Sequence, residues 1–289
     1  MKKALVLINQ HSRKGQKLLP QAAARLQALD FELITESTNH PLDLPDTIRR
    51  YKNRVELVIV GGGDGTLNAA IEGLIDTQLP LGILPMGTAN DLARTLGIPT
   101  SLAEACQVIA SGKIRAIDLG WVNGKHFFNV ASLGLSVKIT ERLTKEVKRR
   151  WGIFAYAFTA LQAIWNARPF RAEIRANNEC FQVKTIQIAI GNGRYYGGGM
   201  TVAEDATIDD RRLDLYSLET QHWWEIIALQ PAMRQGNLAS WSNVRALHAQ
   251  EIEVYTRKPR RINTDGEITT HTPAKFRVIP KALAVITPG

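Results

Sequence analysis

The sequence predicts an N-terminal α/β domain with a parallel sheet, followed by a second domain rich in antiparallel β-structure. Over about the first 110 residues, apolar runs typical of buried strands alternate with segments of helical periodicity. One such unit, residues 57–75, is a strand, a glycine-rich turn and a helix in succession. From about residue 120 onward, short segments separated by turns replace this pattern. Strands that alternate with helices form parallel sheets, whereas short strands joined by turns favour antiparallel ones.

Length and composition set the class of protein. The chain has 289 residues, enough for one large domain or two of ordinary size, and its 45% hydrophobic and 22% charged residues are typical of globular proteins. The net charge of +9 indicates an anionic partner: a nucleotide, an acidic membrane surface or a nucleic acid. The sequence has no zinc-type spacing and no aromatic–basic nucleic-acid module, so we expect no nucleic-acid partner.

The cysteines and the apolar runs indicate in which cellular compartment the protein is expected. Cys106 and Cys180 are far apart and form no CxxC pair, which favours a reducing compartment and argues against a disulfide or metal framework. The apolar run at residues 4–8 is too short for a signal peptide, and no run of 18 apolar residues could span a bilayer. We therefore expect a cytoplasmic protein.

The first elements are a strand at residues 4–8, a helix at 18–29 and a second strand at 31–35. The polar loop at residues 9–15 joins the first strand to the helix. Asn9 or Ser12 in this loop could lie near a phosphate, and a solvated basic loop is the alternative.

The central unit begins with a β-branched strand at residues 57–60, continues through four glycines around Asp64, and ends in an amphipathic helix. Such a turn brings its backbone close to a ligand, and the helix start favours an anion such as phosphate. It is not a P-loop, because it lacks the lysine, and not a dinucleotide fingerprint, because Thr66 stands at the third glycine. Asp64 fits if it caps the next helix or if a divalent cation separates it from the phosphates. A tight packing turn is the alternative.

A second strand–turn–helix unit follows. Residues 81–84 form a strand that Pro85 ends, and Gly87 turns the chain. Thr88 stands three residues before Asp91, a capping-box spacing at the head of a helix over residues 89–96. Both units present their helix starts at the carboxyl edge of the sheet, where ligands bind. Asn90 then contacts the nucleotide, or it is simply a first-turn helix residue.

After the second unit, the sequence predicts one more helix and then a change of domain. A helix ends near residue 110, and a domain boundary falls near residues 118–122, just before a hairpin at 122–125. Two segments could contact a membrane: a basic one at residues 138–150 and an aromatic–aliphatic one at 151–165, too short to cross a bilayer. Packing on the β domain is the alternative. The later strands are predicted at residues 181–192, 252–255, 276–278 and 283–286.

Two motifs carry a family resemblance. The sequence GGDGT at residues 62–66 resembles the nucleotide loop of diacylglycerol kinases, sphingosine kinases, ATP-NAD kinases and phosphofructokinases. The sequence PMGTANDLAR at residues 85–94 resembles the motif of the lipid-kinase branch. The resemblance is to bacterial soluble lipid kinases and covers nearly the whole chain. It implies a Rossmann-like nucleotide domain at residues 1–120, joined by a C-terminal strand at about 283–289, and a β-sandwich-like domain at 121–282.

The resemblance also implies which residues bind ATP. Thr38 matches the family's nucleotide-contacting threonine; Thr35 is its rival, and either could instead be a helix cap. Gln10 departs from the family, which has proline there. The implied ATP-binding residues are Asn9, Thr38, Gly62, Gly63, Asp64, Gly65, Thr66, Asn68, Gly87, Thr88 and Asn90.

Three C-terminal stretches extend the resemblance. Residues 191–200 resemble the family's Gly-Asn…Gly-Gly-Gly turn. Residues 205–214 resemble its Mg²⁺ loop, which implies ligation by the Asp210 side chain and by the Thr207 and Arg212 backbone. Arg211 stands where the family prefers glycine, and a polar hairpin is the alternative.

The third stretch, residues 263–267, resembles the Asp-Gly-Glu motif in which the glutamate is the general base. Glu267 and Asp64 are therefore the implied catalytic residues. Asp265 either binds metal or orients Glu267.

The implied function is an ATP- and Mg²⁺-dependent kinase that phosphorylates a lipid hydroxyl, most naturally of a diacylglycerol-type lipid. An ATP-NAD kinase and a non-catalytic nucleotide- or lipid-binding regulator are the alternatives. The implied partners are ATP and a membrane lipid, with peripheral contact to an anionic inner membrane face. A homodimer is compatible with the sequence.

Overall fold

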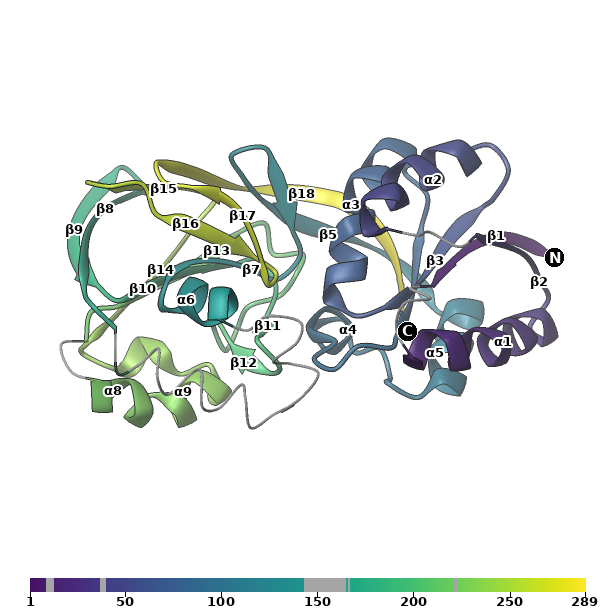
Figure 1. Cartoon of the computed structure of the whole chain (residues 1–289), viewed down its shortest axis with the longest axis horizontal. Coiled ribbons are helices and arrows are strands. Elements are labelled where there is room, and N and C mark those ends of the chain that lie inside the picture. Colours follow the sequence, from purple (N-terminus) through teal and green to yellow (C-terminus); the bar gives the residue numbers. More distant parts are fainter. Residues whose placement is uncertain (9–12, 37–39, 143–164, 166, 221–222) are drawn as a thin grey trace. The chain divides into compact units, whose positions relative to one another are not determined.

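The structure is a computed structural model that describes residues 1–8, 13–36, 40–142, 165, 167–220 and 223–289. The chain folds into two compact units (Figure 1). Unit 1 comprises Met1–Leu119, Gly197–Gly199 and Ile279–Gly289. Unit 2 comprises Gly120–Tyr196 and Met200–Val278.

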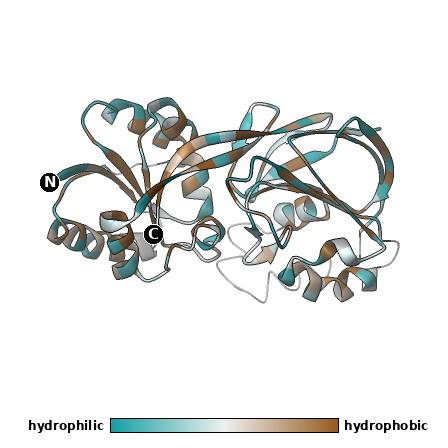
Figure 2. Cartoon of the chain, turned by 180° about the vertical axis from the view of Figure 1, so that it is seen from behind, coloured by the Kyte–Doolittle hydropathy of each residue, from teal (hydrophilic) through white to brown (hydrophobic). Residues whose placement is uncertain are grey.

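Unit 1 is built on a parallel sheet with the strand order β2-β1-β3-β4-β18. Its central strands are almost continuously apolar and buried, as expected for a sheet covered on both faces. Figure 2 shows this concentration of hydrophobic residues on the strands. The strands are β1 (Lys2–Ile8), β2 (Phe31–Glu36), β3 (Leu57–Gly62), β4 (Leu81–Pro85) and the end of β18 (Ala274–Thr287).

Helices cover both faces of this sheet. In Figure 1, α1 (Arg13–Ala28) and α5 (Leu102–Ser111) lie on one side, and α2 (Leu44–Tyr51) and α3 (Asp64–Thr77) on the other. The strand–helix alternation and the parallel sheet confirm the fold class predicted for this part of the chain. Helix α2 was not predicted, because residues 41–51 are short and rich in charge and proline.

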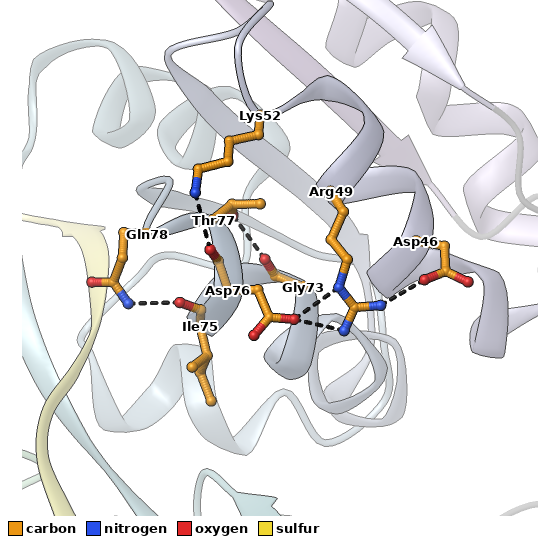
Figure 3. A network of polar contacts seen from close by, with 8 residues as sticks. All are labelled: Asp46, Arg49, Lys52, Gly73, Ile75, Asp76, Thr77 and Gln78. Carbon is orange, nitrogen blue, oxygen red and sulfur yellow. Dashed lines mark hydrogen bonds and ion pairs between the residues drawn. The ribbon is translucent and has the colours of Figure 1, made fainter.

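Helices α2 and α3 pack closely because Gly73 removes a side chain from their contact. A Cβ on Gly73 would lie 2.8 Å from the Cα of Pro45. At the rim of the contact, Arg49 of α2 bridges to Asp76 of α3 at 2.6 Å and to Asp46 at 2.5 Å (Figure 3). These side chains are exposed, so the apolar contact rather than the ion pairs stabilises the packing.

Several predictions about element bounds were wrong. The strand predicted at residues 181–192 is two strands in different sheets, β9 (Glu179–Thr185) and β10 (Gln187–Gly191), and the helix predicted at 18–29 begins earlier, at Arg13. Helix α4 is only Asp91–Thr95, because Asn90 adopts a left-handed conformation (φ +51°) that a helix cannot include. The strands predicted at residues 276–278 and 283–286 are one strand, β18. The stretch around Pro280 interrupts the apolar pattern, but the Asp118 carboxylate accepts the Lys281 N–H at 2.7 Å and the strand continues.

Unit 2 contains two antiparallel layers, which confirms the predicted β-sandwich-like class. Their apolar faces share one core that includes Phe127, Ile190 and Phe276. One layer continues from β18 through β15 (Glu251–Thr256) and β8 (Phe170–Ala176) to β9 (Glu179–Thr185). The other has the order β14-β13-β10-β7-β16-β17. Its strands are β7 (Val130–Gly134), β10 (Gln187–Gly191), β13 (Leu213–Leu218), β14 (Val244–Ala249), β16 (Arg261–Thr264) and β17 (Glu267–His271).

Smaller elements complete unit 2. The predicted hairpin is present: Asn123 and Gly124, both with positive φ, join β5 (Lys113–Val122) to β6 (Lys125–Phe127). A second core, which includes Tyr216 and Ile226, lies beneath short helices. Among the described residues, the other elements of unit 2 are α6 (Leu135–Arg142), β11 (Tyr195–Tyr196), β12 (Met200–Thr201), α8 (Trp223–Ala228), α9 (Gln230–Gln235) and a short 3-10 helix, η2 (Leu238–Ser240).

The segments predicted to contact a membrane fall mainly outside the described residues. Only residues 138–142, which belong to α6, and the exposed Trp165 are described. Within the described ranges, no helix combines the length and apolar character needed to cross a membrane.

Candidate active site

The two glycine turns of unit 1 meet backbone to backbone. A Cβ on Gly87 would lie 2.5 Å from the Cα of Gly63, and a Cβ on Gly63 would lie 3.1 Å from the Cα of Gly87. The Met86 N–H also donates to the Gly62 carbonyl at 2.9 Å. The prediction that both turns lie at one edge of the sheet is therefore confirmed. Side chains at these positions would push the turns apart, which explains the glycines.

Asp64 joins the two turns by capping a helix, but not its own. It is the first residue of α3, and its Oδ1 accepts the N–H of Leu92 in α4 at 3.0 Å. Its Oδ2 accepts no hydrogen bond from the described part of the chain, so one carboxylate oxygen remains for a ligand. At the start of α3, the N-cap Gly63 supplies no side-chain hydrogen bond, and a phosphate would satisfy the N–H groups there.

The other predicted ATP-binding residues occupy varied positions. Gly65, Thr66 and Asn68 lie in the first turns of helix α3. Thr88 is exposed in the glycine turn that follows β4. Gly62 is needed because a Cβ there would lie 2.5 Å from Oγ1 of Thr66. Asn9 and Thr38 lie outside the described residues, and the rival Thr35 lies within β2.

Asn90 braces the second turn. Its Oδ1 accepts the Gly87 N–H at 2.8 Å, and its Nδ2 donates to the Gly87 carbonyl at 3.1 Å. The predicted Thr88–Asp91 capping box does not form, because Asn90 is the N-cap and its side chain bonds backward to the turn. Neither sequence-based interpretation of Asn90 included this bracing contact, and its contact with a nucleotide stays a prediction.

Replacing Gly87 by alanine should therefore disrupt the two glycine turns that are predicted to bind phosphate. The new Cβ would overlap the Gly63 backbone, which cannot rotate away, so we expect a loss of about 1–3 kcal/mol in stability together with weaker ATP binding. Gly63→Ala is the matched comparison and should be milder, because its Cβ contact is longer. Denaturant unfolding and calorimetric ATP titration measure both effects. Equal or reversed effects of the two variants would contradict this account.

The triple glycine of residues 197–199 belongs to unit 1. All three glycines have positive φ, and the Gly198 N–H donates to Oδ2 of the buried Asp91 at 2.9 Å. This hydrogen bond brings the glycine backbone close to the start of α4. Asp91 lies in the predicted motif, but its role as the acceptor for Gly198 was missed because the two residues are far apart in sequence.

In unit 2, Asp265 fixes the turn that carries Glu267. Its Oδ2 accepts the N–H of Phe128 at 2.7 Å, and its Oδ1 accepts those of Asn129 and Val130 at 2.9 and 3.0 Å. Glu267 follows at the first, exposed position of β17. With three backbone donors on its carboxylate, Asp265 is suited to orienting the turn rather than to binding metal. This favours one of the two roles that the sequence left open.

Asp265→Asn should separate turn geometry from ATP binding. An amide cannot accept at both ends, so at least one backbone N–H is left facing an NH₂ group, and we expect a loss of roughly 1.5–3 kcal/mol in stability. Because the displaced turn carries the proposed base, the turnover number should fall while ATP affinity stays unchanged. Unfolding, steady-state rates and ATP titration measure these three quantities. Asp76→Asn, at an exposed ion pair, is the control and should leave all three near the wild-type values. Unchanged stability and turnover in Asp265→Asn would refute the orienting role.

The same region contains two buried asparagines. Asn192 donates from Nδ2 to the Phe128 carbonyl at 2.8 Å, and its N–H donates to the Asn129 carbonyl at 2.8 Å. Asn129 is only 3% exposed, and its Oδ1 has no hydrogen-bond partner among the described residues. Asn192 was part of a recognised motif, whereas Asn129 carried no local signal in the sequence.

The predicted metal loop is closed by Asp210, whose Oδ2 accepts the Thr207 N–H at 3.0 Å and whose Oδ1 accepts the Arg212 N–H at 3.2 Å. Arg211 adopts φ +60°, so it takes the conformation for which the family uses glycine. Each carboxylate oxygen of Asp210 accepts one backbone hydrogen bond and keeps lone-pair capacity, so the donor set fits a hard cation. No group of three or more His, Cys, Asp or Glu residues able to hold a metal occurs in the described ranges.

A cation of the protein itself lies beside this loop. The Arg212 guanidinium lies 2.8 Å from Asp205, 3.4 Å from Asp210 and 3.2 Å from Asp214. Its hydrogen bond lowers the pKa of Asp205. Burial raises the pKa of Asp214 to about 6, against the opposing effect of Arg212. A metal ion bound by the loop would therefore share these carboxylates with the Arg212 guanidinium.

Comparison with known proteins identifies the family. A sequence model of the diacylglycerol kinase catalytic domain matches residues 3–122, and one of the YegS C-terminal NAD kinase beta sandwich-like domain matches residues 129–287. The chain belongs to the diacylglycerol kinase and YegS-like lipid kinase family. Its likeness to NAD kinases is one of fold in the C-terminal domain.

Individual relatives agree with this assignment. A diacylglycerol kinase of Bacillus subtilis (strain 168) is 28% identical over 100% of this chain and 97% of its own length. A protein of Enterobacter sp. (strain 638) described as "Probable lipid kinase YegS-like" is 34% identical over 79% of this chain and 77% of its own. The crystal structure of "a putative diacylglycerol kinase" from Bacillus anthracis str. Sterne matches with a TM-score of 0.84 and 25% identity, over 99% of this chain and 97% of that one.

Proposed function

We propose that this protein is an ATP-dependent lipid kinase that phosphorylates the hydroxyl of a diacylglycerol-type lipid. The observation that carries the proposal is the contact between the Gly63 and Gly87 turns beside the uncapped start of α3. Bare backbone, a helix N-terminus and an acidic residue at one place suit a nucleotide triphosphate with its cation. Family membership supports the lipid as the acceptor.

In the proposed reaction, the turns of unit 1 bind the ATP phosphates, and Asp64 faces their counter-ion. Glu267 accepts the proton of the lipid hydroxyl while the hydroxyl oxygen bonds to the γ-phosphorus. The bond between that phosphorus and the β,γ-bridging oxygen breaks, and ADP leaves. Catalysis then rests mainly on positioning and electrostatics.

Mg²⁺, when bound, offsets the negative charge on the phosphates. In unit 2, the residues proposed to hold a cation are Asp210 through its carboxylate and Thr207 and Arg212 through their carbonyls.

The test is a panel of acceptors incubated with labelled ATP, with and without Mg²⁺. The panel includes diacylglycerol, monoacylglycerol, phosphatidylglycerol, a sphingoid base and NAD. We expect Mg²⁺-dependent labelling of diacylglycerol and none of NAD. Labelling of NAD instead would favour an ATP-NAD kinase. ATP binding without labelling of any acceptor would favour a non-catalytic regulator and refute the proposal.

We also propose that the protein works at an anionic membrane surface on the cytoplasmic side, because its lipid acceptor resides in a membrane and its net charge is +9. Sedimentation with vesicles tests this. Binding to vesicles that contain phosphatidylglycerol should exceed binding to phosphatidylcholine vesicles and should weaken with salt. Equal binding to both would refute the electrostatic contribution.

A further inference from the structure

Unit 2 carries a group of basic side chains at one end of its sheet. The strands β15, β8 and β9 are antiparallel neighbours (Figure 1), so the end of β15, the start of β8 and the end of β9 lie together. Residues 167–172, 181–186 and 255–262 contain seven basic residues and no acidic one. These seven, here called the basic end of unit 2, are Arg168, Arg171, Lys184, Arg257, Lys258, Arg260 and Arg261. A local excess of positive charge of this size favours an anionic partner.

Three of these cations form a row across the strands. Arg171 of β8 stands directly opposite Lys184 of β9, and both side chains are exposed. They lie on the outer face of the sheet, because Ala172, the next residue of β8, belongs to the core. Arg257, which follows the last residue of β15, continues the row on the other side of β8. Like charges directly opposite one another destabilise a sheet, and an anionic partner would offset this cost.

The acidic side chains near this row are paired with other groups. Glu173, the next outward-facing residue of β8, lies 2.5 Å from Arg175 and accepts a hydrogen bond from Gln182 at 2.6 Å. Of the seven basic side chains, only Arg261 has an acidic partner in the described part of the chain, Glu141 at 2.8 Å. The described side chains therefore do not neutralise the charge of the basic end.

Arg260 is held in place within the basic end. Its guanidinium carbon lies 3.9 Å from the centre of the Phe170 ring, and its backbone N–H donates to Oγ1 of Thr272 at 2.9 Å. Partial burial lowers the pKa of Arg260, because a charge withdrawn from water loses hydration. A cation in this position gains more from a nearby anion than a fully hydrated one does.

The shape of the basic end suits an extended anionic surface. Its row spans three strands, roughly 10 Å, on the outer face of the sheet, and the other cations lie on the turn after β15 and just before β8. Trp165, five residues before Phe170, is 64% exposed, and indole rings favour the membrane–water interface. Exposed cations beside an exposed tryptophan are typical of a surface that contacts lipid headgroups.

We propose that the basic end of unit 2 is the surface by which the protein docks on a bilayer that contains anionic phospholipids. This inference rests on the proposed kinase function, because a lipid acceptor requires contact with a membrane. It goes beyond the net charge of the chain by assigning the contact to one set of side chains. The phosphates of the headgroups would pair with the row and with Arg260, and the like-charge repulsion within the row would then be offset.

Two triple variants with the same net charge test the proposal. The row variant replaces the three cations of the row: Arg171→Gln, Lys184→Gln and Arg257→Gln. The control variant replaces three exposed basic residues of unit 1: Lys2→Gln, Arg50→Gln and Lys113→Gln. A basic residue near an anionic surface contributes about fivefold to binding, so the row variant should bind vesicles of equal parts phosphatidylglycerol and phosphatidylcholine on the order of 10²-fold more weakly than the wild type. The control variant should stay within about threefold, and thermal unfolding should show the row variant at least as stable as the wild type.

Phosphorylation of two forms of the acceptor separates this proposal from the kinase function. A short-chain diacylglycerol dispersed in uncharged detergent needs no bilayer, so the row variant should label it at the wild-type rate. Diacylglycerol in the anionic vesicles should be labelled much more slowly by the row variant. If the wild type labels neither form, the kinase function fails, and vesicle binding still tests the surface separately.

Three results would overturn the docking surface while leaving the kinase function intact. The first is wild-type vesicle binding by the row variant. The second is an equal loss of binding in the control variant, which would show that only the net charge matters. The third is loss of affinity for a duplex oligonucleotide, with vesicle binding retained, which would identify the basic end as a surface for nucleic acid.

Discussion

Glu267→Gln should abolish most lipid phosphorylation while leaving the fold intact. The amide has the size of the carboxylate but cannot accept the proton of the attacking hydroxyl, and loss of general-base catalysis costs roughly 10²–10⁴-fold in rate. Glu267 is exposed at the start of β17, so we expect a change in stability within about 0.5 kcal/mol. Initial rates with saturating lipid and ATP measure the first effect, and denaturant unfolding measures the second.

The control for this variant is Glu179→Gln, which removes another exposed carboxylate from unit 2, at the start of β9. It should leave the rate unchanged, which separates a loss of general charge from a loss at the site. ATP affinity should be the same in both variants, because the turns proposed to bind ATP belong to unit 1. A Glu267→Gln protein that turns over lipid at the wild-type rate would refute the assignment of the base.

Local sequence patterns were sufficient to predict the fold class and the meeting of the two glycine turns. Apolar β-branched runs define buried strands, and in a parallel sheet consecutive strand–turn–helix units must present their turns at one edge. Gly63 and Gly87 therefore met as expected. The predicted start of α4 was wrong because two residues could have capped this helix. Thr88 could have capped a helix from residue 89, but Asn90 is the N-cap, in a left-handed conformation, and the helix begins at Asp91.

The parts of the site that were missed depend on contacts between distant residues. Asp265 binds backbone groups more than 130 positions earlier, at residues 128–130, and Asp91 binds Gly198 more than 100 positions later. Backbone donors carry no side-chain signature, so no pattern in the sequence marks Phe128 or Asn129 as partners. At Arg211 a local signal was misleading. An arginine where the family prefers glycine argued against the turn of the predicted metal loop, yet Arg211 adopts the left-handed conformation that this turn requires.

Asp64 has two roles that a pair of variants can separate. Its Oδ1 caps α4 through the Leu92 N–H, and its carboxylate charge is proposed to face the cation on the ATP phosphates. Asp64→Asn keeps an oxygen for the cap but removes the charge, so stability should stay close to that of the wild type. Lipid phosphorylation should fall roughly 10²-fold or more, because interactions with a catalytic cation contribute several kcal/mol to the transition state.

Asp64→Ala removes both the cap and the charge. It should match the rate loss of Asp64→Asn and in addition lose about 0.5–2 kcal/mol of stability, the usual cost of a lost helix cap. Raising the Mg²⁺ concentration should partly restore Asp64→Asn if the charge serves the cation, and it should leave the stability deficit of Asp64→Ala unchanged. If Asp64→Asn instead phosphorylates lipid at the wild-type rate, Asp64 only caps α4, and the glycine turns must bind the phosphates without its charge.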